Sequence, residues 1–556
     1  MSEDKSLRYT FVISCYFENK LEMYNSLKEY VKFLEEKGEL RRIKEFTDPV
    51  LEIACATDIE SKKPGGGKAL LFENTGTDFP VLTNMMGSEA RIRHALCIPS
   101  LDEVGPRIDA LVDSVLSEKK GLRDKLKMLP VLNQAASWMP RPHKGHAPCQ
   151  DVVQYAARLS ALPVLKCWPQ DGGRFITLPL VNTVSPLTGI RNVGMYRMQV
   201  LDDTTTGMHW HMHKTGAKHL SECTHRLPVA VCLGGDPIYS YAATAPLPEG
   251  IDEYLLAGFL RGKPVELVKC FTQELMVPAD CDFVIEGYVQ KSEEKFMEGP
   301  FGDHTGFYSL EDLYPKFHVT CITHRFDAIY PATVVGIPPM EDKYIQEATE
   351  KIFLSPIKLA IAPEIEDLYL PEEGVGHNFA IAKIRKQYEG QAFKVANALW
   401  GAGQMMFNKF LLVVDEDIDI RSWDAVFDAI CRNVDVNRDL LFSHGPLDVL
   451  DHAAPETGFG GKLCIDATRK AVAFRERRQD QVVQVLFDPD EQKASRYRKL
   501  WLLGANCDPV RDGRVRDHLI LDATTKKGLP GFKRRWPDIV AHDPEMIVRM
   551  AERLKD

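Results

Sequence analysis

The sequence predicts an α+β protein of several domains, in which a β-rich middle segment lies between two α/β segments. Between about residues 150 and 330, short runs of β-branched residues are separated by Gly and Pro, which favours a β-barrel or a sandwich. On both sides of this segment, short strands alternate with amphipathic helices, as they do in α/β layers. A chain of 556 residues also exceeds what one hydrophobic core usually organises.

The first predicted domain covers residues 23–135. Ser26 and Glu29 have the spacing of a capping box at the start of a helix, and Gly38 is placed to end that helix. Further elements are expected in the same domain: strands over 69–72 and 81–83, and a helix over 101–116.

Two more domains are predicted to follow, over residues 136–330 and 331–556. The Pro-rich stretch 138–148 is interpreted as a linker or surface loop. In the middle domain, strands are expected over 175–184, 193–201, 264–270, 283–289 and 316–323. In the last domain, helices are expected over 344–353, 391–407 and 544–554, and strands over 409–414 and 463–467.

Residues 1–22 precede the first well-formed helix and look appended to the domains. A disordered extension and a downstream translation start at Met23 are both open interpretations. The apolar stretch 11–17 is too short for a signal peptide, and no apolar run approaches the ~20 residues that span a bilayer. We therefore expect no stable membrane insertion.

Composition narrows the class of protein and its compartment. Hydrophobic residues make up 44% and charged residues 27%, as in ordinary globular proteins. The formal net charge of -10 gives no general attraction to phosphate backbones, so nucleic acid is not an expected partner. The 13 cysteines are scattered singly and odd in number, which predicts neither a disulfide framework nor a Cys-based zinc module and favours the cytoplasm.

A first candidate site is the segment 191–197 on a predicted strand. Arg197 could grip a planar carboxylate with two parallel hydrogen bonds, and the Asn192 carbonyl could serve a hard cation. The alternative is a structural ion pair between the arginine and an acid. Gly194 would permit a β-bulge that turns Asn192 and Arg197 toward one pocket.

Three histidines at every second position form a second candidate site. His209, His211 and His213 would share one face of a strand, and H-x-H spacing is typical of zinc sites. One alternative is a polar sheet face. The other is a zinc-dependent hydrolase that uses these three residues.

A third candidate site is the turn-rich segment 298–306, in which Gly and Pro separate two acids. Glu298 and Asp303, held near one arginine, could take different pKa values, as proton transfer requires. Turn chemistry alone could also explain the Gly and Pro. The glycine-rich stretch 457–462 lacks the residues of a phosphate-binding Walker loop and is interpreted as a mobile loop or lid.

Taken together, these segments resemble the UbiD family of reversible decarboxylases. Further segments resemble the family in family order, and only the first two dozen residues lie outside the resemblance. These further family-like segments are Glu73-Asn74-Thr75-Gly76, Thr83-Asn84-Met85-Met86-Gly87, residues 336–342, residues 461–468 and Asn506-Cys507-Asp508-Pro509.

The resemblance implies a fold, a set of cofactors and several partners. It implies an N-terminal α/β domain, a central split β-barrel like that of flavin reductases, and a C-terminal α/β domain with an oligomerisation role, hence a homo-oligomer such as a dimer or hexamer. The cofactors would be prenylated FMN, made by a separate flavin prenyltransferase, with Mn²⁺ or Mg²⁺ and often K⁺. The substrate would be an aromatic acid, a hydroxybenzoate or naphthoate of ubiquinone or menaquinone biosynthesis.

The resemblance also implies roles for individual residues. Asn192, His213 and Glu253 match the metal and cofactor-phosphate set. The residues at flavin-contacting positions are Met195, Tyr196, Arg197, His209, Trp210, His211, Lys214 and Thr215, of which His209, His211 and Thr215 differ from many relatives. Arg197, Glu298 and Asp303 match the catalytic network, in which Arg197 holds the carboxylate, Glu298 relays protons and Asp303 donates the proton. Fungal ferulic acid decarboxylase has Glu in place of Asp303, whereas quinone-pathway members have Asp. A non-catalytic flavin-binding protein is a further alternative.

Overall fold

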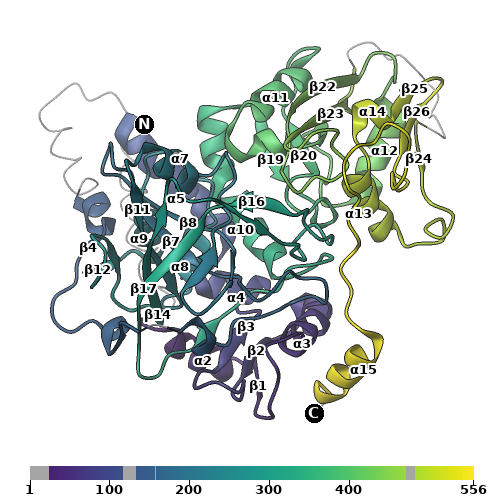
Figure 1. Ribbon diagram of the computed structural model, residues 1–556. Coiled ribbons are helices and arrows are strands. Elements are labelled where there is room, and N and C mark those ends of the chain that lie inside the picture. Colours follow the sequence, from purple (N-terminus) through teal and green to yellow (C-terminus); the bar gives the residue numbers. More distant parts are fainter. Residues whose placement is uncertain (1–23, 117–132, 157, 471–481, 556) are drawn as a thin grey trace, which may run out of the picture. The chain divides into compact units, whose positions relative to one another are not determined.

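The computed structural model describes residues 24–116, 133–156, 158–470 and 482–555 (Figure 1). The predicted extension 1–22 and Met23 lie outside the described residues. The chain forms two compact units. Unit 1 consists of Met1–Phe301, Glu311–Val334 and Ala541–Asp556, and unit 2 of Gly302–Leu310 and Val335–Val540.

Helix α2 (Leu27–Glu36) opens unit 1 where the sequence predicts it. The Ser26 hydroxyl accepts a hydrogen bond from the Glu29 N–H at 3.1 Å, which confirms the predicted N-cap. The Glu29 carboxylate, however, accepts from the Asn25 N–H at 2.7 Å, so this half of the capping box lies one residue earlier than predicted. Gly38 has a φ of +72° directly after the helix, as its predicted role requires.

The N-terminal part of unit 1 is a four-stranded sheet in the order β1-β2-β3-β18. Its strands are β1 (Leu40–Ile43), β2 (Ala69–Phe72), β3 (Val81–Thr83) and β18 (Tyr330–Pro331). The strands predicted over 69–72 and 81–83 are confirmed, and the helix predicted over 101–116 starts as a 3-10 turn. The helices of this part are α3 (Glu52–Ser61), α4 (Glu89–Ala95), η2 (Leu101–Glu103) and α5 (Val104–Leu116).

The middle part of unit 1 is an antiparallel sheet, and its strand β8 carries the candidate site residues Asn192 and Met195. Its order is β10-β17-β14-β11-β7-β8, and β5 (Val152–Gln154) also pairs with β17. The strands are β10 (Thr205–Gly207), β17 (Lys316–His324), β14 (Phe283–Gln290), β11 (Arg226–Leu233), β7 (Leu180–Val184) and β8 (Arg191–Met195). Within the described residues, β10 and β8 do not pair with each other, so the sheet is open and a closed barrel is absent.

Shorter strands and helices complete the middle part. The stretch 138–148, predicted as a loop, contains β4, which pairs with β12. The remaining pairs are β12 with β13, β6 with β9, and β15 with β16. Their bounds are β4 (Arg141–Pro142), β6 (Phe175–Ile176), β9 (Met198–Gln199), β12 (Glu266–Lys269), β13 (Met276–Pro278), β15 (Phe296–Glu298) and β16 (Asp312–Tyr314), with helices α7 (Thr215–Glu222), α8 (Ile238–Ala242) and α9 (Glu253–Arg261).

Unit 2 is built on a five-stranded sheet in the order β19-β20-β21-β23-β22. The three inner strands are parallel and the two edge strands antiparallel, and their bounds are β19 (Ile365–Tyr369), β20 (Phe379–Ile384), β21 (Phe410–Asp415), β22 (Leu440–Pro446) and β23 (Phe459–Asp466). Alternate side chains enter two different cores: Ile381 and Leu412 pack in one, whereas Ala382 and Val413 pack in the other. A parallel sheet buried on both faces explains why its strands are almost continuously apolar.

Helices cover both faces of this sheet, and a small second sheet follows. The helices are α10 (Glu341–Ala360), α11 (Gln391–Trp400), η6 (Gly403–Phe407), α12 (Trp423–Asn433), α13 (Arg496–Asn506) and α14 (Pro509–Asp512). Residues of α11 line the core that contains Val413, and residues of α12 line the core that contains Leu412. The second sheet has the order β24-β26-β25, formed by β24 (Val483–Leu486), β26 (Leu519–Asp522) and β25 (Gly513–Val515).

The glycine-rich stretch is not the predicted mobile loop or lid. Gly460 and Gly461 lie inside the buried strand β23, and the Lys462 side chain is 1% exposed. The Gly461 N–H donates to the Asp508 carboxylate at 2.7 Å, and a Cβ on Gly461 would lie 2.4 Å from that carboxylate. The glycine is therefore needed for close packing of α14 against the strand.

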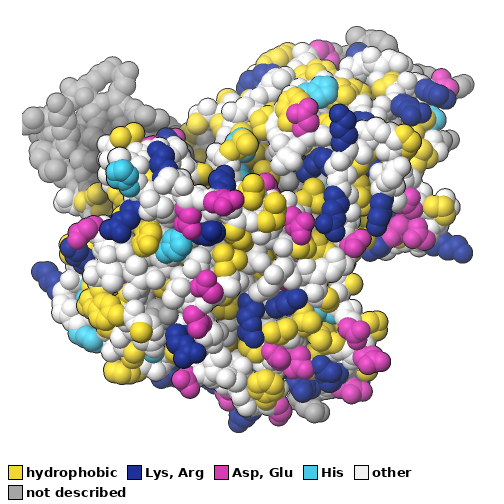
Figure 2. Space-filling model, in the orientation of Figure 1, with side chains coloured by type: hydrophobic (Ala, Val, Ile, Leu, Met, Phe, Trp, Pro, Cys, Tyr) yellow, Lys and Arg dark blue, Asp and Glu magenta, His cyan; other side chains and the backbone are white. Residues whose placement is uncertain are grey.

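The C-terminal helix α15 (Pro544–Arg553) belongs to unit 1, although the chain reaches it from unit 2. It packs against α3, where Arg549 pairs with Glu52 at 2.7 Å. No helix within the described ranges is both long enough and apolar enough to cross a membrane. On the face drawn in Figure 2, basic and acidic side chains are intermingled, as on a solvated surface.

The unit 2 core offers a direct test of this architecture. Leu411 of β21 is fully buried, so Leu411→Ala is expected to cost about 2–5 kcal/mol because it leaves a cavity. Leu359→Ala on α10, where the side chain is 50% exposed, is the control and should change stability by less than about 0.5 kcal/mol. Thermal unfolding midpoints measure both, and equal effects would contradict the assigned core.

Candidate active site

Two side chains of unit 1 contact the same buried carboxylate, that of Glu298. The Arg197 Nε donates to Glu298 Oε1 at 2.9 Å, and its Nη2 lies 2.8 Å from the same oxygen. The His209 Nδ1 is also 2.8 Å from Glu298 Oε1. Glu298 is the last residue of β15, Arg197 lies between β8 and β9, and His209 follows β10. Separate strands thus bring two nitrogen-bearing side chains to one acid.

The surroundings keep Glu298 ionised. Burial raises the pKa of this carboxyl, but the charge of Arg197 and the hydrogen bond from His209 outweigh it, so the net pKa lies below its usual value. The second oxygen, Oε2, is buried and has no hydrogen-bond partner among the described residues. A buried carboxylate oxygen without a donor is costly, which suits a site that receives a ligand or a proton.

Hydrogen bonds hold the turn that follows Glu298. Gln199 bridges it: its amide nitrogen donates to the Gly172 carbonyl at 3.0 Å, and its amide oxygen accepts from the Gly299 N–H at 3.0 Å. The Gly172 N–H donates to the Pro300 carbonyl at 2.7 Å. A Cβ on Gly172 would lie 2.1 Å from the Gly299 carbonyl oxygen, so only glycine permits this approach. The carboxylate is therefore held by a rigid turn.

The prediction that the three histidines share one face of a strand is wrong. Strand β10 ends at Gly207, and the chain from there to α7 is irregular. His209 is buried against Glu298, whereas His213 is exposed, and the ring centroids are 6.1 Å apart for His209 and His211. Among the described residues, no group of three His, Cys, Asp or Glu side chains is placed to hold a metal ion. The zinc-hydrolase alternative loses its geometric basis.

The predicted β-bulge at Gly194 is also absent. Strands β7 and β8 pair in unbroken register from Leu180 with Met195 to Val184 with Arg191. A Cβ on Gly194 would lie 2.3 Å from the Tyr196 ring, so the glycine makes room for that ring. Arg197 is redirected by the end of the strand, and not by a bulge.

Two of the three predicted metal ligands lie on adjacent elements. Glu253 is the first residue of α9, and its carboxylate accepts from the Val193 N–H of β8 at 2.8 Å. The Asn192 amide nitrogen donates to the Tyr196 hydroxyl at 3.4 Å, so its amide oxygen is the atom that could bind a cation. Burial raises the pKa of Glu253 to about 7. His213 is exposed in the segment before α7, and its place in the set stays a prediction.

The predicted flavin-contacting residues are mostly buried or half-buried. The rings of Tyr196 and Trp210 are 6.2 Å apart and perpendicular, and both side chains are buried. The Trp210 Nε1 is buried without a partner in the described part of the chain. The others, Met195, His211, Lys214 and Thr215, are half-buried, and Lys214 and Thr215 open α7, which has no side-chain cap.

Asp303 belongs to unit 2, where its side chain accepts hydrogen bonds from the next residue along the chain. Its Oδ1 accepts from the backbone N–H of His304 at 2.8 Å and from the His304 Nδ1 at 2.8 Å. No sequence pattern assigned a role to His304, or to His209 as a partner of Glu298. The position of His304 next to Asp303 was a signal that could have marked it as a site residue. No local pattern marks His209 as a partner of Glu298.

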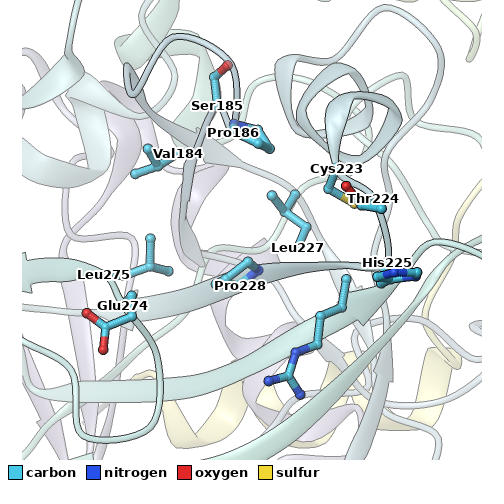
Figure 3. A pocket seen from close by; sticks show the side chains of 11 residues that line it. Val184, Ser185, Pro186, Cys223, Thr224, His225, Leu227, Pro228, Glu274 and Leu275 are labelled. Atoms are coloured by element: carbon cyan, nitrogen blue, oxygen red, sulfur yellow. The ribbon is translucent and has the colours of Figure 1, made fainter.

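A groove elsewhere in unit 1 takes no part in this constellation (Figure 3). It has a volume of about 480 Å³ and lies between the end of β7 and the start of β11. Ladder pairing of β7 with β11 is confined to Ala230–Cys232, because Pro228 has no N–H to donate. None of the predicted site residues lines the groove, which is formed by Val184, Ser185, Pro186, Cys223, Thr224, His225, Arg226, Leu227, Pro228, Glu274 and Leu275.

Comparison with known families and structures identifies the class of protein to which this chain belongs. The family model of the 3-octaprenyl-4-hydroxybenzoate carboxy-lyase Rift-related domain matches residues 141–338. Models of the N-terminal and C-terminal domains of the same carboxy-lyase match residues 31–108 and 343–467. The three matches define a carboxy-lyase.

Relatives support this over most of the chain. An uncharacterized protein of Aquifex aeolicus is 48% identical over 451 residues, covering 80% of this chain and 92% of that protein. One from Archaeoglobus fulgidus is 46% identical over 453 residues, covering 80% and 92%. The chain belongs to the UbiD family.

Solved structures of similar fold agree with this family assignment. Vanillic acid decarboxylase of Sedimentibacter hydroxybenzoicus in its closed form has a TM-score of 0.70 and 26% identity, and covers 85% of this chain and 97% of that chain. The UbiD-class enzyme HmfF of Pelotomaculum thermopropionicum in complex with FMN has a TM-score of 0.67 and 26% identity, and covers 82% and 96%. The multidomain α+β fold is therefore that of UbiD-class enzymes.

The charge on Glu298 makes a testable contribution to stability. Because its pKa is lowered from 4.5 on folding, the ionised form stabilises the fold above that pH, and this contribution is lost as pH falls through the lowered pKa. Glu298→Gln is therefore expected to destabilise the protein by about 1–3 kcal/mol at pH 7, with the difference shrinking in acid.

Thermal unfolding of both proteins between pH 3 and pH 7 measures this, with the exposed Glu294→Gln as a control that should have little effect. A difference that does not change with pH would show that the charge of Glu298 is not what stabilises the turn.

Proposed function

We propose that this protein is a reversible, non-oxidative decarboxylase of an aromatic carboxylic acid that uses prenylated FMN. The observation that carries the proposal is the buried Glu298 carboxylate, bound by Arg197 and His209 and left with one unpartnered oxygen. This arrangement lies in the domain that matches the carboxy-lyase family model. It supplies a cation for a substrate carboxylate and an ionised acid beside it.

The residues fit a bound flavin. Trp210 Nε1 and Glu298 Oε2 are buried polar atoms that lack partners among the described residues, and a polar ligand would satisfy them. The uncapped N-terminus of α7, at Lys214 and Thr215, suits a phosphate. Met195, Tyr196, Arg197, His209 and His211 would complete the contacts. When bound, the prenylated flavin supplies the electron sink for the pair of electrons that the departing CO₂ leaves behind.

The donor chemistry also fits a divalent cation at the flavin phosphate. Asn192 and Glu253 offer oxygen atoms, which suit Mn²⁺ or Mg²⁺ better than a thiolate-binding metal, and His213 would add a nitrogen. A bound cation would offset the cost of burying the Glu253 charge, which raises the pKa of this carboxyl to about 7. K⁺ is expected at the same phosphate in many family members.

The side chains divide the work of the reaction. Arg197 binds and orients the substrate carboxylate, and Glu298 fixes the guanidinium and relays protons through its unpartnered oxygen. Asp303 delivers the proton that replaces CO₂ on the substrate carbon. An intact pair of Arg197 and Glu298 has no evident use in a flavin-storage protein, which weighs against that alternative.

The substrate is proposed to be a hydroxybenzoate or naphthoate precursor of ubiquinone or menaquinone. Asp303, where some relatives have Glu, supports this choice, as does the name of the matching family models. The same proposal includes domain boundaries near residues 135 and 330 and a split barrel formed around the open sheet. It also includes assembly as a homo-oligomer and a cytoplasmic location.

One experiment tests the reaction and narrows the substrate. The chain is co-expressed with a flavin prenyltransferase, and the purified holoenzyme is assayed for CO₂ release from hydroxybenzoates, naphthoates and cinnamates. Release from at least one aromatic acid is expected. A flavin-loaded protein that releases no CO₂ and exchanges no isotope across the panel would revive the flavin-storage alternative.

Asp303→Asn tests the proton donor. The amide keeps the shape of the side chain but has no acidic proton, so turnover should fall by about 10²- to 10⁴-fold. Flavin content, read from the absorbance spectrum, should stay that of the wild type. Near-normal turnover would refute the role of Asp303.

Glu253→Gln tests the metal set. Loss of a charged oxygen ligand should weaken Mn²⁺ binding by at least about 10-fold, as read by electron paramagnetic resonance of the free ion. Glu249→Gln, four residues earlier and on the surface, is the matched control and should bind Mn²⁺ like the wild type. Equal affinities for both variants would remove Glu253 from the set.

A further inference from the structure

We propose that His304 holds the proton that Asp303 delivers to the substrate, so that the two residues act as one donor. This inference rests on the proposed function of Asp303 and adds the source of its proton. It is carried by the geometry of unit 2, in which the imidazole donates directly to the carboxylate.

The two side chains make a short and well-aligned pair. Asp303 Oδ1 accepts from the His304 Nδ1 at 2.8 Å and from the His304 backbone N–H at 2.8 Å. The Asp303 side chain is 9% exposed and that of His304 is 28% exposed. The carboxylate is thus nearly closed to water, whereas the imidazole keeps some access to it. A proton from solvent can reach His304 more readily than it can reach Asp303.

The loop that carries the pair is fixed within unit 2. Asp303 begins a tight turn, in which the Gly306 N–H donates to the Asp303 carbonyl at 3.0 Å. The Trp501 indole N–H donates to the Thr305 carbonyl at 2.8 Å, and the Val540 N–H donates to the Gly306 carbonyl at 3.0 Å. Gly306 has a φ of +82°, and a Cβ there would lie 2.7 Å from the Trp501 ring. Pre-organisation of this kind suits a group that transfers a proton.

The charges around His304 favour its protonated form. Burial alone would lower the pKa of His304, but Asp303, Asp448 and Asp342 together raise it to about 9. Asp342 lies in the first turn of α10, and Asp448 follows β22. His377 also lies against the ring, and the two ring centroids are 5.4 Å apart. Burial lowers the pKa of His377 to about 4, so it stays neutral and adds no competing charge.

The proton therefore sits on the imidazole at neutral pH, which determines the order of events. As CO₂ leaves, the Nδ1–H bond of His304 breaks while an O–H bond forms on Asp303. The O–H bond then breaks as the new C–H bond forms at the carbon that lost CO₂, with the electron pair that the decarboxylation released. Asp303 ends as a carboxylate, and neutral His304 recovers its proton from solvent. No oxidant or reductant is consumed.

His304→Gln separates proton storage from a merely structural role. The Gln amide can still donate a hydrogen bond to Asp303, but it cannot give up a proton at neutral pH. Turnover of the holoenzyme is expected to fall by about 10²- to 10⁴-fold, while flavin content and the thermal midpoint stay unchanged. The wild-type turnover should decline above about pH 9, where His304 loses its proton.

His318 and Glu293 form a similar pair at 2.6 Å, with side chains 28% and 26% exposed, so His318→Gln should leave turnover and its pH profile unchanged. If His304→Gln turns over like the wild type while Asp303→Asn does not, this inference fails and the proposed function stands. If both variants are active, the proposed role of Asp303 fails as well. Should His304→Gln not fold, a wild-type turnover that stays level from pH 7 to pH 10 overturns the inference.

Discussion

The chemistry of this protein depends on one buried carboxylate that must stay charged. Glu298 is 1% exposed, and an isolated charge so deep would be neutralised at a large cost. Two hydrogen-bonding partners offset that cost, Arg197 through two nitrogens and His209 through one. In return, the acid holds the guanidinium in one orientation. The turn fixed by Gln199 and Gly172 exists to hold this carboxylate at the meeting point of several strands.

In unit 2, the environment of the acid Asp303 favours a bound proton, in contrast to that of Glu298. Asp303 has a histidine as its neighbour in sequence and in space, and the surrounding acids raise the pKa of that histidine, which favours a protonated pair. Glu298 is stabilised without its proton, whereas the pair of Asp303 and His304 retains one. The proposed decarboxylation needs such a separation of protonation states, because one acid must stay charged and another must return a proton to carbon. Both states follow from the charges of neighbouring side chains.

Much of the fold was predictable because its signals are local. The β2 and β3 strands, the Ser26 cap and the apolar strands of unit 2 follow from patterns within a few residues. The family resemblance was likewise carried by short segments, and the domain models confirm it. The network around Glu298 was less accessible, since Arg197 and His209 lie 101 and 89 residues away from it along the chain.

The wrong predictions have two physical causes. The alternation of His209, His211 and His213 suggested a strand, but β10 ends at Gly207. Beyond it, His209 makes a buried hydrogen bond to Glu298. Gly194, Gly460 and Gly461 suggested a bulge and a lid, whereas each makes room for a neighbouring group: the Tyr196 ring, the Leu447 side chain and the Asp508 carboxylate. Glycine reports a spatial need without saying whether backbone freedom or close packing creates it.

The most direct test of the central claim is isotope exchange by the flavin-loaded holoenzyme. The wild type and Glu298→Gln are each incubated with an aromatic acid and ¹³C-labelled bicarbonate, and label in the recovered carboxyl group is measured. The account predicts incorporation by the wild type and its loss in the variant at equal flavin content. Equal incorporation by both proteins would contradict it, because reversible carboxyl transfer would then not need the buried charge.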